Sequence, residues 1–144
     1  MRKAHRPRTT TEGFTLLEMV VVLAIISIIL GGAVGVIRGI INSAREDQVR
    51  TDFRTMEVML LKYQITSDSF PTSEQGLDAL VAKPTRGPIP RRWSQVVDEL
   101  PLDPWGSEFE YRYPGSKKPQ DFELVSAGKD RIRGTGDDMS SQDD

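Results

Sequence analysis

Hydrophobic positions along the chain follow two patterns that meet near Ile41. Residues 19–37 are uncharged and read MVVVLAIISIILGGAVGVI, a run long enough to cross the core of a bilayer as one helix. We predict a continuous helix from about Phe14 to about Gln64, apolar all round in its first half and amphipathic in its second. The second half carries apolar residues at three- and four-residue steps, the spacing of one buried helix face: Val49, Phe53, Met56, Leu60 and Tyr63.

Shorter elements are predicted after this helix. Thr72 and Gln75 have the spacing of a capping box, which favours a second helix that begins there and stops before Pro84. The polar tail from Ser140 to Asp144 predicts a frayed end.

Two strands are predicted further along. Residues 109–113 alternate aromatic and charged side chains, the pattern of a half-buried strand, and residues 122–126 offer a return strand. The fold class is therefore α+β, with a small antiparallel sheet packed on the amphipathic half of the long helix. Trp105, in the turn-forming Asp103-Pro104-Trp105-Gly106 segment, is expected to pack against that helix.

Composition excludes several classes of function. The formal charge is −2, of which residues 1–13 contribute +3, so the remainder stands at −5 and offers no basic stripe for nucleic acid. There is no cysteine, and the single histidine is His5. No nucleophile, phosphate-binding or dinucleotide motif is present, and we therefore expect the protein not to be an enzyme.

One carboxylate lies at the N-terminal end of the apolar run. Glu18 comes directly before Met19, and a carboxylate in the bilayer interior costs roughly 2.5–3.5 kcal/mol on insertion scales. Four basic residues precede it in the first eight positions, as in a secretory signal. One interpretation is a plain signal anchor whose Glu18 reaches the interface; the other is that Glu18 has a partner or a functional role in the membrane.

A second acidic cluster lies near the C-terminus. Asp130, Asp137 and Asp138 occur in a loop that also contains three glycines. Hard oxygen ligands on a bending backbone suit calcium, although three side chains cannot fill its six to eight positions. Neighbouring Lys129 and Arg131 support a solvated loop instead, so the residues alone leave both interpretations open.

The stretch Gly13-Phe14-Thr15-Leu16-Leu17-Glu18 resembles the class III leader of type IV pilins and pseudopilins. The resemblance implies that a prepilin peptidase cuts between Gly13 and Phe14 and that Phe14 becomes the N-methylated terminus. It also implies that Glu18 pairs with the Phe14 amine of a neighbouring subunit during assembly. Glu12 departs from the basic or amide residue that is common before the glycine.

Two further segments resemble one branch of that superfamily, the major pseudopilin or G subunit of type II secretion systems. They are FPTSEQGL at residues 70–77 and LPLDPWG at residues 100–106. The resemblance implies a type IV pilin-like fold with a C-terminal calcium loop. The implied calcium ligands are the side chains of Asp130, Asp137 and Asp138 and the main-chain oxygens of Ala127 and Ile132.

The resemblance also implies an organisation and a function. Residues 1–13 would be the prepilin leader, 14–41 the transmembrane and assembly half of the helix, and 42–144 the periplasmic head. The subunit would be a single-pass protein of the bacterial inner membrane that forms a homopolymer, the periplasmic pseudopilus, and drives export of folded proteins across the outer membrane. Minor pseudopilins and an inner-membrane assembly platform would be its partners. The alternatives are a type IV pilin for adhesion, motility or DNA uptake, and a membrane-anchored binding protein that never polymerises.

Overall fold

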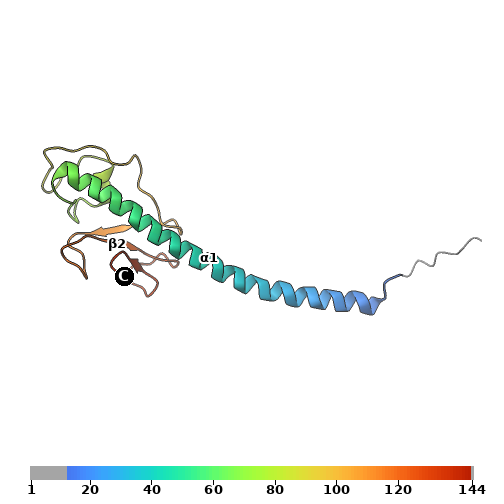
Figure 1. Cartoon of the computed structure of the whole chain (residues 1–144). Helices are drawn as coiled ribbons and strands as arrows, with labels where there is room; N and C mark the ends of the chain where they lie inside the picture. The colour runs from blue at the N-terminus through green and yellow to red at the C-terminus, as the bar shows by residue number, and fades with distance from the viewer. Residues whose placement is uncertain (1–12, 144) are drawn as a thin grey trace, which may run out of the picture. The chain divides into compact units, whose positions relative to one another are not determined.

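The computed structural model describes residues 13–143 (Figure 1). Its elements in chain order are a long helix α1 (Leu16–Ser67), a single 3₁₀ turn η1 (Leu77–Leu80) and the strands β1 (Glu110–Arg112), β2 (Glu123–Ser126) and β3 (Met139–Ser140). The chain divides into two compact units, the first ending at Ile41 and the second beginning at Asn42. Each unit is described by itself below.

Helix α1 confirms the prediction of one continuous helix. It begins two residues later and ends three residues later than expected. No proline occurs between Pro7 and Pro71, so nothing removes a backbone donor from its interior. The helix ends where Asp68 takes a left-handed conformation, with φ 63°, which closes the last turn.

The first unit consists of the apolar half of α1. Its large apolar side chains are exposed, from 45% at Ile26 to 76% at Ile28 between Met19 and Ile41. Within residues 13–143, α1 is the one helix long and apolar enough to cross a membrane. None of the apolar segment of α1 is buried inside the protein, so lipid or other helices must cover these side chains.

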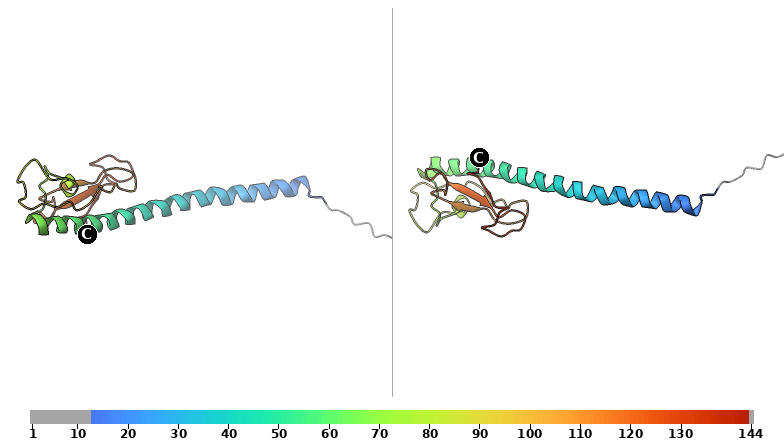
Figure 2. Two further views of the ribbon diagram at one scale, coloured as in Figure 1. Left: turned by 90° about the horizontal axis from the view of Figure 1, so that it is seen from above. Right: turned by 90° about the horizontal axis from the view of Figure 1, so that it is seen from below.

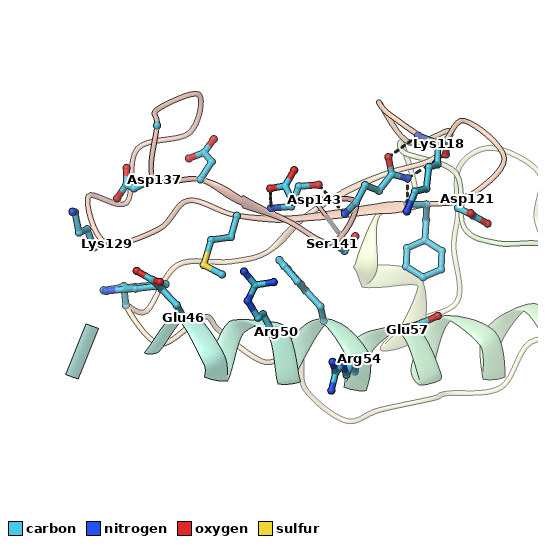
Figure 3. Close-up of a pocket in the computed structure, with 18 of the residues that line it drawn as sticks. Glu46, Arg50, Arg54, Glu57, Lys118, Asp121, Lys129, Asp137, Ser141 and Asp143 are labelled. Carbon is cyan, nitrogen blue, oxygen red and sulfur yellow. Dashed lines mark hydrogen bonds between the residues drawn. The ribbon is translucent and has the colours of Figure 1, made fainter. Parts of the chain in front are cut away.

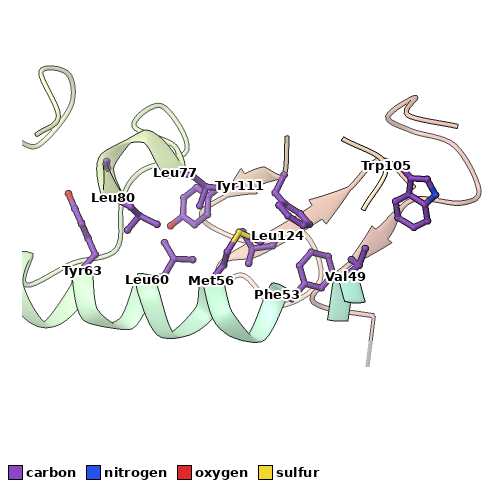
Figure 4. Packing of buried hydrophobic residues seen from close by; sticks show 12 residues of the cluster. Val49, Phe53, Met56, Leu60, Tyr63, Leu77, Leu80, Trp105, Tyr111 and Leu124 are labelled. Atoms are coloured by element: carbon purple, nitrogen blue, oxygen red, sulfur yellow. The ribbon is translucent and has the colours of Figure 1, made fainter. Parts of the chain in front are cut away.

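The second unit contains the hydrophobic core. The predicted stripe of α1 is confirmed, since Val49, Met56 and Leu60 are fully buried. Figure 4 shows these side chains projecting from one side of the helix toward the strands. Phe53 meets Phe109 edge to face at 5.7 Å between ring centroids. The cluster also contains Tyr63, Leu77, Leu80, Trp105, Tyr111 and Leu124, as expected for Trp105.

The sheet is antiparallel in the order β1-β2-β3 and lies along one side of the second half of α1 in both views of Figure 2. Glu110 pairs with Val125, and Val125 pairs in turn with Ser140. The two predicted strands are thus confirmed, and β3 is an addition that the sequence did not predict.

The expectation of a frayed tail is wrong for residues 140–143, and Asp144 lies outside the described residues. Gln142 is 5% exposed. Its Oε1 accepts from the N–H groups of Lys117 and Lys118, both at 2.9 Å, while its Nε2 donates to the carbonyls of Lys118 and Phe122. A polar side chain can be buried when its hydrogen bonds are made, and this amide anchors the tail together with the β3 pairing and the bond from the Ser141 N–H to the Leu124 carbonyl.

The expected second helix is reduced to η1. The capping box is present, because the Thr72 N–H donates to Gln75 Oε1 at 3.0 Å and the Gln75 N–H donates to Thr72 Oγ1 at 3.3 Å. Gly76 then takes φ 61° and ψ −164°, which interrupts the helical path directly after the box. Only Leu77–Leu80 continue, as one 3₁₀ turn that places Leu77 and Leu80 in the core.

Candidate functional site

The start of α1 carries the residues predicted for processing and assembly. Gly13 and Phe14 precede the helix and are exposed, Phe14 at 83%. Thr15 and Glu18 form a reciprocal cap: the Thr15 N–H donates to Glu18 Oε2 at 3.3 Å, and the Glu18 N–H donates to Thr15 Oγ1 at 3.2 Å. Residues 1–12, most of the predicted leader, lie outside the described residues.

This cap gives Glu18 a partner that the sequence analysis did not consider. A carboxylate in the first turn also meets the positive end of the helix dipole, which stabilises it. The two bonds that reach the carboxylate, from the Thr15 N–H at 3.3 Å and from Thr15 Oγ1 at 3.4 Å, are long for such bonds, and both end on Oε2. The side chain is exposed, so a second donor can reach it.

The acidic loop joins the end of β2 to the start of β3, at residues 127–138. Its carboxylates bind the loop's own backbone: Asp130 accepts from the Ile132 N–H at 2.8 Å, and Asp138 Oδ2 accepts from the Gly134 N–H at 2.7 Å. Asp137 accepts from the Asp130 N–H at 3.0 Å and from Thr135 Oγ1 at 2.7 Å. The bond from Thr135, followed by the one from the Asp130 backbone, lowers the pKa of Asp137 below its ordinary value.

At Gly128 this loop requires a glycine. The φ of Gly128 is +65°, and a Cβ added to it would lie 2.2 Å from the carbonyl oxygen of Asp137. No side chain fits at that distance. The close approach of the two backbones brings the start and the end of the loop together beside β2.

The predicted calcium ligands are only partly brought together. Within residues 13–143 no group of three His, Cys, Asp or Glu side chains is arranged to hold a metal ion. Ala127 is buried at 2% exposure, whereas Ile132 is 60% exposed and its carbonyl already accepts from Thr135 Oγ1 at 3.0 Å. The calcium site is therefore not demonstrated by side-chain clustering.

One observation nevertheless fits a cation. Asp138 Oδ1 is buried and has no hydrogen-bond partner. A buried carboxylate oxygen without a donor is costly, and a hard cation satisfies it. Calcium also accepts main-chain oxygens and water, so it does not require three clustered carboxylates. The donor chemistry of the loop fits calcium on this ground.

Asp103 is a structural residue whose role sequence reasoning missed. It is 4% exposed. Its Oδ1 accepts from the N–H groups of Trp105 and Ser107 at 3.1 and 2.7 Å, and its Oδ2 accepts from Ser126 Oγ at 2.7 Å. The Asp-Pro pair signalled the turn, but Ser126, 23 residues further on, had no sequence signal. The bond ties this turn to β2 just before the acidic loop.

A polar groove lies between the second half of α1 and the C-terminal segment (Figure 3). Its volume is about 790 Å³. Side chains of both charge signs line it, among them Arg50, Arg54, Lys129, Glu57 and Asp143, and Lys117 pairs with Asp143 beside it. The buried Trp105, whose Nε1 lacks a partner, borders the same groove as Asp138. No cysteine or histidine lines the groove.

Comparison with known families covers nearly the whole chain. Residues 37–142 match the family described as Type II secretion system (T2SS), protein G. Residues 8–34 match the Prokaryotic N-terminal methylation motif, which includes Gly13, Phe14 and Glu18.

Individual relatives agree with this assignment. The type II secretion system core protein G of Pseudomonas aeruginosa is 35% identical over 132 residues, covering 90% of this chain and 92% of the relative. The core protein G of Vibrio cholerae is 38% identical over 132 residues, covering 90% of each chain.

A solved structure is similar as well. It is the crystal structure of the major pseudopilin from the type 2 secretion system of enterohaemorrhagic Escherichia coli, with a TM-score of 0.66 and 35% identity over 72% of this chain and 90% of that one. The long N-terminal helix and small antiparallel sheet of this chain are thus the fold of that class. The chain belongs to the type II secretion system protein G family.

Proposed function

We propose that this protein is the major pseudopilin of a type II secretion system, a subunit that polymerises into a periplasmic filament whose growth exports folded proteins. The observation that carries the proposal is the match to core protein G over 90% of the chain. The exposed apolar half of α1 supports it, because that surface needs lipid before assembly and neighbouring helices afterwards.

The same proposal assigns the chain its processing and its location. A prepilin peptidase would cut between Gly13 and Phe14 and methylate the new amine, and the N-terminal methylation motif supports this step. The helix would then hold the subunit as a single pass in the inner membrane, with residues 42–144 in the periplasm. Minor pseudopilins and an inner-membrane assembly platform would receive it there.

Glu18 would guide assembly through charge. After cleavage the Phe14 amine of a neighbouring subunit brings a positive charge into a layer of low dielectric constant, where opposite charges attract more strongly than in water. Glu18 has an exposed carboxylate for that amine and keeps its cap to Thr15 until the amine arrives. Since an unpaired carboxylate is costly in the membrane and a paired one is tolerated, pairing favours the polymer.

Calcium would complete the head at the acidic loop. Asp130, Asp137 and Asp138 would supply side-chain oxygens, and Ala127 and Ile132 would supply main-chain oxygens. A bound ion would hold the loop closed against β2, a role that disulfides fill in other small domains. The partnerless oxygen of Asp138 is the feature of the structure that supports this assignment.

The decisive experiment measures the mature N-terminus and export together. Mass spectrometry of the native protein should find N-methylated Phe14 as the first residue. Glu18→Ala should reduce filament formation and export while leaving cleavage intact, and Glu18→Asp should retain part of both. Fully active protein that keeps residues 1–13, or normal filaments from Glu18→Ala, would overturn the respective assignments.

A further inference from the structure

The outer face of α1 in the second unit carries an apolar crest, formed by Val58, Leu61 and Ile65. These side chains are 66%, 42% and 82% exposed. Val58 lies two residues from both Met56 and Leu60 of the core stripe, and two residues turn the helix by about 200°. The crest therefore faces away from the core. Isolated exposed apolar residues are common, but three at a spacing of three and four residues form a continuous strip.

Basic side chains flank this crest. Arg54 lies one turn before Val58, and Lys62 lies one turn after it. Both are exposed. Within residues 13–143 neither forms a hydrogen bond or an ion pair with another side chain of the chain. The crest is thus an apolar strip with Arg54 and Lys62 beside it, and its Leu61 also borders the polar groove that Arg54 and the acidic Glu57 line.

A groove with complementary properties lies on the flank of the same helix. We call it the Leu102 groove; its volume is about 460 Å³. Leu102 itself is 54% exposed. Its lining combines apolar residues with two acids: Met59, Leu100, Pro101 and Leu102 are apolar, Asp52 and Glu99 are acidic, and Thr55 completes the set.

The carboxylates of Asp52 and Glu99 can each accept a further interaction from a cationic side chain. Asp52 accepts one hydrogen bond, from Gln48 Nε2 at 2.8 Å. Glu99 is exposed and makes no side-chain hydrogen bond or ion pair within residues 13–143. An apolar strip with basic residues beside it and a groove lined by apolar and acidic residues therefore occur on one molecule.

We propose that the crest of one subunit seats in the Leu102 groove of the next copy of this chain. Apolar surface meets apolar surface, and Arg54 and Lys62 meet Asp52 and Glu99. Lipid is not the occupant, because the polar residues 42–48 separate the crest from the apolar run along the sequence. This inference rests on the proposed function, since it supplies the contact between heads in the polymer.

The two surfaces differ, and this decides the symmetry of the contact. When one patch binds a different patch on an identical molecule, the contact is heterologous, and each added copy leaves a crest and a groove free. Such a contact repeats without closing into a dimer. It is therefore suited to an open filament.

The absence of cysteine from the chain makes a crosslinking test direct. Val58→Cys combined with Leu102→Cys, in full-length protein expressed with its secretion system, should give a ladder of oligomers on oxidation. Val58→Cys alone should give no dimer. Coexpression of the two single variants should give dimers and nothing larger, because each pair joins one crest to one groove.

A matched control is available in Ile89, which is 54% exposed, the same as Leu102, and lies outside the groove. Val58→Cys with Ile89→Cys should give no ladder. A ladder of equal strength from this control, dimers from Val58→Cys alone, or filaments seen by electron microscopy without a crest–groove ladder would overturn the inference and leave the proposed function standing. Absence of filaments from the wild type would overturn both.

Charge reversal tests the basic and acidic residues of the two surfaces. Asp52→Lys with Glu99→Lys should reduce the yield of crosslinked ladder roughly two- to fivefold, the range expected for exposed ion pairs. Arg54→Glu with Lys62→Glu should reduce it by a similar factor. The four changes together should restore the ladder, and a combined loss without recovery would reject the proposed charge pairing.

Discussion

The two halves of α1 share one backbone helix and differ in what surrounds their side chains. Between Met19 and Ile41 the large apolar residues are exposed on every side, whereas the apolar residues of the stripe from Val49 to Tyr63 are at most 7% exposed. The second half is completed by its own chain through β1, β2 and η1. The first half has no such partner within residues 13–143, so its stability depends on lipid or on other subunits.

This contrast separates two kinds of sequence constraint. In the second half, a side chain is held by its fit to a packed core. In the first half, a side chain needs only to be apolar enough for the membrane and compatible with helix packing. The same type of substitution should therefore destabilise the head in the second half and leave it unchanged in the first.

The largest expected effect is on the stability of the head, when the same truncation to alanine is made in each half of α1. Leu60→Ala removes a fully buried side chain and should lower the free energy of unfolding of the head by about 2–5 kcal/mol. Ile28→Ala, at a position 76% exposed, should leave the unfolding of the head unchanged. Thermal unfolding of the purified protein in detergent measures both. Equal losses for the two variants would contradict the division.

Calcium binding tests whether the second unit reaches its full stability without a bound ion. At free calcium a hundred times its Kd, the head should gain about 2.7 kcal/mol and a higher Tm. A chelator should reverse the gain. Asp138→Asn should abolish the response, because it alters the carboxylate whose Oδ1 lacks a partner. Asp121→Asn, an exposed acid outside the loop, should keep it. A Tm independent of calcium would reject the site.

Asp103 tests how far the head depends on polar contacts as well as its core. Asp103→Ala leaves the N–H groups of Trp105 and Ser107 and the hydroxyl of Ser126 without their acceptor. The expected loss in the free energy of unfolding is about 1–3 kcal/mol. Denaturant unfolding measures it. Asp98→Ala, at an exposed acid, should stay within about 0.5 kcal/mol of wild type.

The smallest expected effect is a dependence on acid pH that belongs to the second unit alone. Burial raises the pKa of Glu123, but hydrogen bonds from Ser116 and Ser140 outweigh it, and the net pKa lies below the ordinary 4.5. A depressed folded-state pKa gives stability that is present above pH 4.5 and is lost as the pH falls through that lower value.

Glu123→Gln should flatten this part of the stability–pH curve, measured by unfolding between pH 3 and 6. A Glu123→Gln protein with the same acid dependence as wild type would show that other carboxyl groups cause it. The variant is close in shape, so the Ser140 hydroxyl, now 2.7 Å from Glu123 Oε1, keeps an acceptor.

Much of this molecule could be predicted from local pattern. The apolar run and the three- and four-residue stripe predicted α1 because helix periodicity is a property of neighbouring residues. Alternation in residues 109–113 predicted β1 for the same reason. The GFTLLE, FPTSEQGL and LPLDPWG segments indicated the family, which the matches over residues 8–34 and 37–142 confirm.

The features that local pattern did not predict mostly depend on contacts between residues that are distant in the sequence. Polar composition at residues 140–144 predicted a free end, yet Gln142 is buried because the carbonyls and N–H groups of residues 117, 118 and 122 surround it. Thr72 and Gln75 predicted a helix that Gly76 cuts short. Asp103 meets Ser126 only after the sheet has formed.

By itself, the sequence determined where this protein must be apolar, which helix face is buried and which family the chain joins, because these follow from short-range periodicity and contiguous motifs. Only the tertiary structure decided that the tail is anchored, that Asp138 keeps a buried oxygen without a donor, and that an apolar crest and a groove lined by apolar and acidic residues share one molecule. Those outcomes depend on which backbone groups and side chains meet across long stretches of chain, and residue order does not show them until the core has brought the segments together.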